Sequence, residues 1–432
     1  MECGTKMSEA VYNVLPLEHP PDCEVQVPGS KSITNRALLI AALAHGESTL
    51  EGALFSDDTH YMAEAWRQVG IGVSEDPAAA RFHVQGHGGR IPAGHAALYV
   101  GNAGTAMRFL TAALCAGNGH FELDGTARMR ERPIQDLLDA LAQLGVRARS
   151  IAGNGCPPVA IDAAGLPGGH ARIAADKSSQ FLSALLLAAP CALSRVELEL
   201  AGGLVAPPYV DMTIGVMEAF GAHVTRQSPG RFIVEPQPYA GCHYRVEPDA
   251  SSAHYFLAAA ALCGGRVRVA GLGSHSLQGD VHFVDLLEQM GATVLRGDDF
   301  LEVRGGVQLD GIEADMNAIS DTAPTLAVLA PFARRRVVIR NIAHVRLQES
   351  DRLHAVATEL QRLGARVQEL DDGLRIEPST LRPGTVATYD DHRLAMAFAL
   401  VGLRTPGIAI RDPGCVRKTF PDFFTRLESL HR

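Results

Sequence analysis

The chain has 432 residues, of which 47% are hydrophobic and 20% charged, and its formal net charge at pH 7 is −9. This length favours two domains over one, and the composition is typical of globular proteins. The negative charge argues against nucleic acid as the main partner, because phosphate backbones require broad basic surfaces. We therefore expect any anionic ligand to be small and to be held by cations gathered locally.

The cysteines and the apolar runs indicate the cellular compartment in which the chain resides. Eight cysteines are scattered without a Cys-x-x-Cys pair, which favours free thiols in a reducing environment over disulfides or a zinc site. The N-terminal stretch lacks the apolar core of a secretory signal, and no apolar run approaches the roughly eighteen residues that a membrane span needs. The sequence therefore predicts a cytoplasmic chain without a membrane partner.

Helices rich in alanine and leucine are predicted to begin at six similar positions. Their starts are expected, at intervals of 70 to 74 residues, near Ser32, Thr105, Ser179, Ser252, Thr322 and His392. A second helix in the first five repeats is expected to close on a glycine, because glycine readily adopts the left-handed conformation at a helix end; these glycines are Gly70, Gly145, Gly221, Gly291 and Gly364. Each repeat is predicted as strand, helix, strand, helix, strand, strand, and such a period determines the architecture.

Three repeats of about 72 residues make a domain of ordinary size. We expect residues 29–242 to hold repeats one to three, and residues 1–28 with 243–432 to form a discontinuous domain of repeats four to six. The chain ends before the last strands of repeat six. The N-terminal segments Tyr12–Leu17 and Glu24–Val27 are predicted to supply them, so that the chain crosses between the domains twice.

Polar and charged residues collect in the turns that open the first helix of each repeat. The glycines of Gly101–Leu114 allow close approach of a ligand to the backbone, and the N–H groups of a helix start attract anions. Ser, Asp and Asn at such positions are also good N-caps, which is our preferred interpretation of Asp249 and Ser252. Capping does not explain Lys31 or Arg393 at the positive end of a helix dipole, so we expect an anion there.

Eight motifs in these turns, running in order from about residue 25 to 425, resemble the enolpyruvyl transferase family. They are Pro28–Ser32 with Asn35-Arg36, Gly101–Arg108, Arg128-Met129 with Arg132-Pro133, Ser178–Phe181, Asp315–Asn317, Glu349–Arg352, Asp391–Arg393 and Lys418–Pro421. The resemblance implies an α/β fold, the two-domain inverse α/β barrel built from six βαβαββ repeat units, three per domain, with the active site in the interdomain cleft.

The chain is most similar to those family members that act on 3-phosphoshikimate. The resemblance implies transfer of the enolpyruvyl group of phosphoenolpyruvate to the 5-hydroxyl of 3-phosphoshikimate, with release of phosphate, in the shikimate pathway of aromatic amino acid biosynthesis. It implies no cofactor and no metal, and it implies glyphosate as an inhibitor of the phosphoenolpyruvate site. We expect a monomer.

The resemblance also implies roles for single residues. The expected catalytic residues are Asp315 as base, Glu349 as proton donor and acceptor, and Lys31. The expected phosphoenolpyruvate ligands are Lys31, Asn102, Gly104, Arg128, Gln180, Arg352, Arg393 and Lys418. The expected acceptor ligands are Lys31, Ser32, Arg36, Ser178, Ser179, Gln180, Tyr209, Asp315, His344 and Gln348.

Three departures from the family pattern fall on the acceptor side. Ala206, His344 and Gln348 stand where the family usually has serine, asparagine and lysine. A neutral amide does not replace the charge of a lysine. Two alternatives therefore stay open at this point: an enolpyruvyl transferase with a different cyclic polyol acceptor, and a non-catalytic binding homologue. Retention of Asp315 and Glu349 counts against the binding homologue.

Overall fold

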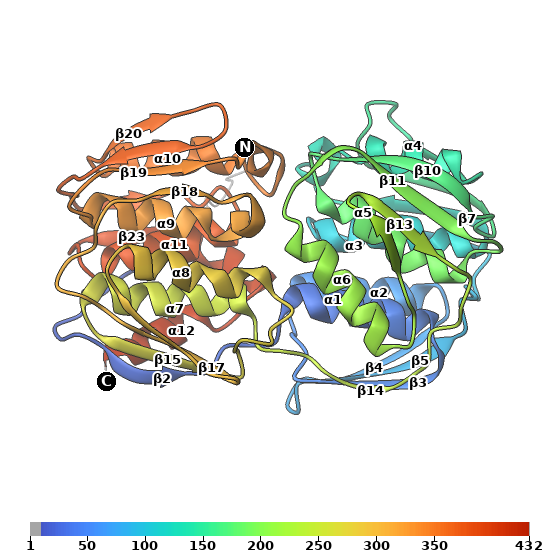
Figure 1. Cartoon of the computed structure of the whole chain (residues 1–432), viewed down its shortest axis with the longest axis horizontal. Helices are drawn as coiled ribbons and strands as arrows, with labels where there is room; N and C mark the ends of the chain where they lie inside the picture. The colour runs from blue at the N-terminus through green and yellow to red at the C-terminus, as the bar shows by residue number, and fades with distance from the viewer. Residues whose placement is uncertain (1–9, 432) are drawn as a thin grey trace, which may run out of the picture. The chain divides into compact units, whose positions relative to one another are not determined.

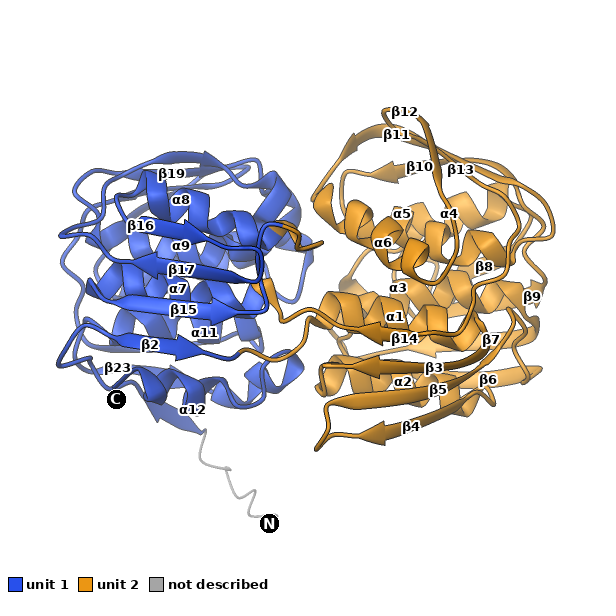
Figure 2. Cartoon of the chain, turned by 60° about the horizontal axis from the view of Figure 1, so that its bottom comes forward, with its two compact units in different colours: residues 1–26, 251–274, 280–432 blue, residues 27–250, 275–279 orange. Residues whose placement is uncertain are grey.

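The computed structural model describes residues 10–431, which form two compact units (Figures 1 and 2). Unit 2 consists of Val27–Ala250 and the short segment His275–Gly279. Unit 1 consists of the residues before Val27, the segment Ser251–Ser274 and the chain from Asp280 onward. The chain therefore passes between the units four times, whereas two crossings were predicted.

The second crossing comes at Ala250, later than the predicted residue 242. Strand β14 (His243–Arg245) pairs in parallel with β3 (His45–Glu51), which keeps it in unit 2. The segment 275–279 returns to the same crossing, because the Gln278 side chain donates to the backbone oxygen of Pro248 (2.7 Å) and accepts from the N–H of Ala250 (2.9 Å).

Unit 2 contains three four-stranded sheets and six α-helices among its described residues. The sheets have the strand orders β14-β3-β5-β4, with β5 (Arg81–His87) and β4 (Gly72–Asp76); β6-β7-β9-β8, with β6 (His95–Tyr99), β7 (Asn118–Asp124), β9 (Val159–Ala164) and β8 (Arg147–Ser150); and β10-β11-β13-β12, with β10 (Gly169–Ala175), β11 (Val196–Leu204), β13 (Arg231–Val234) and β12 (Thr225–Ser228). The helices are α1 (Lys31–Leu43), α2 (Asp57–Gln68), α3 (Gly104–Ala113), α4 (Gln135–Gln143), α5 (Ser179–Ala188) and α6 (Pro208–Ala219).

Unit 1 contains two four-stranded sheets and one three-stranded sheet among its described residues, and Figure 2 shows one of them in front of its helices. The sheets are β16-β17-β15-β2, with β16 (Thr293–Arg296), β17 (Phe300–Arg304), β15 (Arg266–Ala270) and β2 (Asp22–Val25); β18-β19-β21-β20, with β18 (Glu313–Asp315), β19 (Val337–Arg340), β21 (Leu374–Glu377) and β20 (Arg366–Glu369); and β1-β23-β22, with β1 (Val11–Asn13), β23 (Ile408–Arg411) and β22 (Gly384–Val386). The helices are α7 (Ala250–Cys263), which straddles the crossing, α8 (Phe283–Gln289), α9 (Ala323–Leu329), α10 (Arg352–Arg362), α11 (His392–Gly402) and α12 (Phe423–Glu428).

The two N-terminal strands join different sheets. β1 pairs with β23, which is the last strand among the described residues, as predicted. The prediction for the second segment was wrong, because β2 pairs in parallel with β15. β2 thus occupies the edge position in the β15 sheet that β14, the strand preceding α7 in sequence, occupies in the sheet of unit 2.

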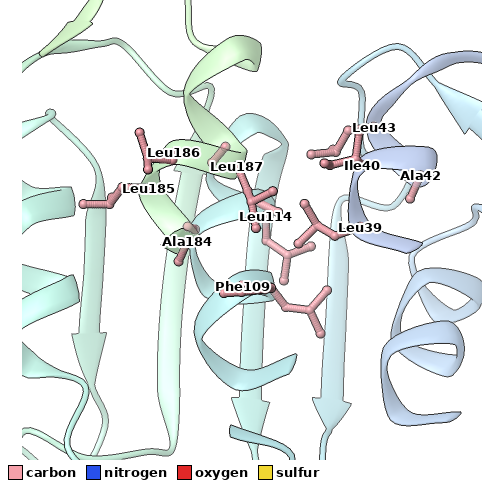
Figure 3. Packing of buried hydrophobic residues seen from close by; sticks show 14 of the residues in the cluster. Leu39, Ile40, Ala42, Leu43, Phe109, Leu114, Ala184, Leu185, Leu186 and Leu187 are labelled. Atoms are coloured by element: carbon pink, nitrogen blue, oxygen red, sulfur yellow. The ribbon is translucent and has the colours of Figure 1, made fainter. Parts of the chain in front are cut away.

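Helices α1, α3 and α5 form the centre of the unit 2 core (Figure 3). Eleven of the thirteen residues of α1 are buried, as is every residue of α3. Most of these residues are apolar, but they include the cations Arg36 and Arg108. The six predicted helix starts lie within two residues of the observed ones, counting α9 for Thr322. All five closing glycines have φ between +82° and +99°, as predicted.

The seven described cysteines are free; Cys3 lies outside the described residues. Among residues 10–431, no helix is long and apolar enough to cross a membrane.

Candidate active site

The glycine turn before α3 brings backbone and cations together. Gly101 has a φ of +56°, and α3 begins at Gly104. A Cβ atom at Gly104 would lie 2.5 Å from Nη2 of Arg132 and 3.0 Å from Nη1 of Arg108, so the missing side chain makes room for two guanidinium groups. Arg132 also donates to the backbone oxygen and to Oδ1 of Asn102, at 3.1 and 3.0 Å. The turn is therefore lined with positive charge, as an anion site requires.

Lys31 is the first residue of α1, where Ser30 caps the helix by accepting from the N–H of Ile33. The Lys31 ammonium lies 3.4 Å from Oδ2 of Asp58, whose side chain is almost fully buried. A lysine is disfavoured at the positive end of a helix, and Asp58 offsets part of that cost. A ligand anion would therefore share Lys31 with a carboxylate that sequence reasoning missed.

Arg36 is a buried cation without a carboxylate partner among the described residues. It donates to Oγ1 of Thr213 (2.8 Å) and to the backbone oxygens of Ser32 (2.9 Å) and Tyr209 (3.1 Å), and its guanidinium lies over the Phe109 ring at 5.1 Å. Burial lowers the pKa of Arg36 to about 10, so it stays charged at neutral pH. A buried charge is costly unless it is paired, and an anionic ligand would pair it.

The N-terminus of α5 presents small polar side chains. Ser178 caps the helix by accepting from the N–H of Gln180 at 3.2 Å, and Ser179 is buried. A helix start with two hydroxyl groups is suited both to capping the helix and to binding an anion.

Two other cations of unit 2 have carboxylate partners at the surface. Arg128 pairs with Glu131 at 3.0 Å, and Lys177 pairs with Asp136 at 2.9 Å. Both pairs are partly exposed, and exposed pairs are weak. The cations therefore remain able to exchange these partners for a ligand.

Unit 1 gathers three buried cations near the ends of its helical segments. Arg352 is the first residue of α10, Arg393 is the second residue of α11, and Lys418 ends a short 3-10 helix over Pro413–Lys418. The exposed fractions are 2% for Arg352, 4% for Arg393 and 8% for Lys418. Cations this deeply buried require counter-charges close by.

Three carboxylates surround Arg352. Its Nε donates to Oδ2 of Asp391 (2.8 Å), Nη1 to Oδ1 of Asp321 (3.0 Å), and Nη2 to Oε2 of Glu349 (3.0 Å). Nη1 also donates to Oε1 of Gln348. Burial disfavours the charged guanidinium, but the three carboxylates outweigh burial and raise the pKa of Arg352. Arg352 is therefore the fixed centre of the cluster.

The other two cations share these carboxylates. Nη2 of Arg393 donates to Oδ2 of Asp321 at 2.6 Å, and Nζ of Lys418 lies 3.6 Å from Oε1 of Glu349. The structure thus brings together the predicted residues Glu349, Arg352, Arg393 and Lys418. It balances their charges within unit 1, with three cations against three carboxylates.

Asp321 and Asp391 are the cluster members that the predicted site did not include. Asp391 is fully buried and caps α11 by accepting from the N–H of Arg393 at 2.9 Å. Each aspartate directly precedes a predicted helix start, Thr322 or His392. An acidic residue at the same place in two repeats was the signal that could have found them.

Asp315 has different surroundings. At the end of β18, its Oδ1 accepts from the N–H of Asn317 (2.9 Å) and its Oδ2 from the side chain of Asn341 (3.0 Å). The side chain is exposed, and none of the described contacts joins it to the cluster. The hydrogen bonds of the predicted base therefore do not connect it to Glu349.

His344 lies near the cluster. Its Nε2 is 2.9 Å from Oγ of Ser320, and burial lowers its pKa although Asp321 acts in the opposite direction. His344 is therefore held in the neutral form. Among the described residues, no group of three or more His, Cys, Asp or Glu side chains is arranged to hold a metal ion.

Solved structures resemble the whole fold. An EPSP synthase from Acinetobacter baumannii is 27% identical and superposes with a TM-score of 0.80, covering 97% of this chain and 98% of that one. The enolpyruvyl transferase NikO from Streptomyces tendae is 21% identical with a TM-score of 0.79 and covers 98% of both chains, which is a likeness of fold alone.

Curated relatives are closer in sequence. The 3-phosphoshikimate 1-carboxyvinyltransferase of Trichormus variabilis is 51% identical over 411 residues, covering 95% of this chain and 96% of the relative. That of Shewanella denitrificans is 48% identical over 413 residues, covering 95% and 96%. The model of the EPSP synthase (3-phosphoshikimate 1-carboxyvinyltransferase) family matches residues 19–427. With identity this high over nearly the full length, the chain belongs to the EPSP synthase family.

Proposed function

We propose that this chain is an enzyme that transfers the enolpyruvyl group of phosphoenolpyruvate to the 5-hydroxyl of 3-phosphoshikimate and releases phosphate. The observation that carries the proposal is the buried cluster of unit 1, in which Arg352, Arg393 and Lys418 lie beside the carboxylates of Asp321 and Glu349. Cations suit the carboxylate and phosphate of phosphoenolpyruvate, and carboxylates suit the proton transfers.

We propose that cations of both units bind the same substrate. The three cations of the unit 1 cluster already contact three carboxylates, which offset part of their charge before a ligand binds. We assign the remaining positive charge to Lys31, Arg128 and Arg132 of unit 2, with Asn102, Gly104 and Gln180 as further phosphoenolpyruvate ligands. We further propose that the fold is the inverse α/β barrel with six repeats.

The two proton transfers need two carboxyl groups. Glu349 protonates the methylene carbon of phosphoenolpyruvate and later removes the proton again, and its two cationic neighbours stabilise its ionised form between these steps. We assign the base at the acceptor hydroxyl to Asp321 in place of Asp315, because Asp321 contacts both guanidinium groups. Addition gives a tetrahedral intermediate, and its collapse expels phosphate.

The acceptor ligands come mainly from unit 2. The unpaired Arg36 suits the carboxylate of 3-phosphoshikimate, and the serines at the start of α5, Ser178 and Ser179, suit its phosphate. Ser32, Tyr209 and His344 complete the proposed set. Gln348 binds Arg352, so its amide orients a phosphoenolpyruvate ligand instead of supplying a charge. The monomeric state and the cytoplasmic location stay predictions.

The test is phosphate release from phosphoenolpyruvate with 3-phosphoshikimate or with unphosphorylated shikimate as acceptor. Release with 3-phosphoshikimate alone supports the proposal. Release with shikimate at comparable kcat/KM contradicts the acceptor assignment, and silence with both contradicts the proposed enzyme.

A further inference from the structure

A buried glutamate outside the proposed site binds the chain segment that leads into the charged cluster of unit 1. Glu359 lies on α10, seven residues after Arg352, and is 1% exposed. Its Oε2 accepts from the N–H of Ala387 (3.1 Å), and its Oε1 accepts from the hydroxyl of Tyr389 (3.0 Å). Arg362 pairs with it at 2.8 Å. Burial and the bond to Glu359 raise the pKa of Tyr389, so this hydroxyl stays a donor.

The segment that Glu359 holds is a tight turn of an unfavourable kind. The N–H of Asp391 donates to the backbone oxygen of Thr388 at 2.9 Å, and the two residues between them, Tyr389 and Asp390, have φ of +55° and +54°. Positive φ at both central positions defines a type I′ turn, which glycine, asparagine and aspartate favour. Tyrosine resists this conformation, and such a turn persists only where its surroundings hold it.

The turn ends at Asp391, which binds the guanidinium of Arg352 and caps helix α11 through the backbone N–H of Arg393. Asp391 accepts from Nε of Arg352 at 2.8 Å and from the N–H of Arg393 at 2.9 Å. Arg352 begins α10, and Glu359 follows two turns later, about 10 Å along the helix axis. Helix α10 therefore holds the segment 387–391 at two places, through Glu359 at its start and through Arg352 at its end.

We propose that Glu359 is a positioning residue: by holding the Tyr389–Asp390 turn it keeps Asp391 aligned with Arg352 and Arg393 for phosphoenolpyruvate. This inference rests on the proposed function, but it concerns a residue that does not touch the substrate. Its consequence is that phosphoenolpyruvate affinity depends on the population of the left-handed turn.

The variant Glu359→Gln keeps the size of the side chain and weakens its hold. The amide presents one acceptor oxygen in place of two and carries no charge toward Arg362. If the turn then keeps its left-handed conformation in about a tenth of the molecules, the Kd of phosphoenolpyruvate rises about tenfold. The kcat at saturating substrate is expected to stay within about threefold of that of the unsubstituted enzyme. Tyr389→Phe removes a single hydrogen bond and is expected to raise the Kd two- to threefold, by the same relation.

A rescue variant separates positioning from general destabilisation. Adding Tyr389→Asn and Asp390→Gly to Glu359→Gln introduces the Asn-Gly pair that type I′ turns prefer. The turn then forms without the carboxylate, and the Kd is expected to return to within about threefold of the unsubstituted value.

Glu302 offers a matched control. This glutamate on β17 is 3% exposed and pairs with Arg266 and Arg304, so Glu302→Gln also removes one buried charge from unit 1. It lies outside the turn and the cluster. We expect lower stability from this variant and a phosphoenolpyruvate Kd within about twofold of the unsubstituted value.

The Kd is measured by titration calorimetry on the full chain, with kcat and KM from phosphate release. The inference is overturned if Glu359→Gln lowers the melting temperature and leaves the Kd unchanged, or if the Asn-Gly pair does not tighten binding. If the unsubstituted chain binds no phosphoenolpyruvate, the proposed function fails, and the crystal structure of Glu359→Gln decides this inference instead. Loss of the positive φ values and of the Asp391–Arg352 contact supports it, and their retention overturns it.

Discussion

Replacing Arg352 by glutamine removes the cation on which three carboxylates of unit 1 converge. The guanidinium is 2% exposed and donates to Asp391, Asp321 and Glu349 at 2.8 to 3.0 Å. Glutamine retains some hydrogen bonding and removes the charge. The variant therefore removes a cation that all three carboxylates contact, while Arg393 and Lys418 remain beside Asp321 and Glu349.

The expected loss of stability is large. Breaking a buried ion pair from one side costs about 3–5 kcal/mol, because the remaining partner stays buried and uncompensated. Asp391 is fully buried, so it cannot recover the lost interaction from water. Total stabilities of about 5–15 kcal/mol are usual, so the variant is expected to lose a considerable part of its stability.

The loss depends on pH in a defined direction. Without the guanidinium, the crowded carboxylates take up a proton more readily in the folded variant than in its unfolded chain. The variant therefore gains stability relative to the unsubstituted protein as the pH falls, since its folded state binds more protons. The difference in unfolding free energy is expected to be larger at pH 8 than at pH 5.

Urea unfolding of both proteins at pH 5 and pH 8 measures this difference. The control is Arg335→Gln, because Arg335 binds both oxygens of Asp310 at 2.8 Å but is mostly exposed. An exposed pair contributes about 0–1 kcal/mol, so the control is expected to lose little. A loss at Arg352 no larger than at Arg335, or a loss that does not shrink toward pH 5, would refute the reasoning.

Three further predictions concern substrate binding, proton transfer and pH. Lys31→Ala or Arg393→Ala is expected to weaken phosphoenolpyruvate binding at least about tenfold in calorimetry, because each removes a full charge from the proposed anion site; unchanged affinity contradicts the role. Asp321→Asn is expected to lower kcat for phosphate release about 10²–10⁴-fold, while Asp315→Asn stays within about threefold; equal losses would reverse the assignment. Because burial lowers the pKa of His344, the unfolded chain binds a proton near pH 6.5 that the folded protein resists, and stability falls as the pH drops. His344→Asn removes this contribution, at most about 1.4 kcal/mol per pH unit, and parallel stability curves between pH 7 and 5 would contradict it.

The repeating pattern of the sequence predicted the buried helices well, because the chemistry of neighbouring residues determines where such helices form. Helices rich in alanine and leucine favour burial, and glycines such as Gly70 and Gly145 end helices by a property of their own backbone. The partner of β2 could not be predicted in this way. Its four residues fit the edge of more than one similar sheet, and its pairing with β15 is a contact between segments more than 240 residues apart.

In the charged cluster, too, the sequence predicted some features and the tertiary contacts decided others. The motifs identified Glu349, Arg352, Arg393 and Lys418 as candidates, and all four lie together. The family resemblance pointed to Asp315 as the base and did not include Asp321. Both precede the same helix, and the contacts of an aspartate depend on which way the turn directs its side chain. A turn such as Tyr389–Asp390, which runs against the preference of tyrosine, is likewise invisible in the sequence.

The sequence alone determined the repeating order of elements, the buried helices and the polar or charged character of the residues at the helix starts. These follow from hydrophobic period, helix ends and charge, which act over a few residues. Only the tertiary structure decided which edge each N-terminal strand joins, which carboxylate faces each guanidinium and what holds the turn before Asp391. Those outcomes depend on groups far apart in the chain, and burial in a shared low-dielectric interior makes their pairing obligatory.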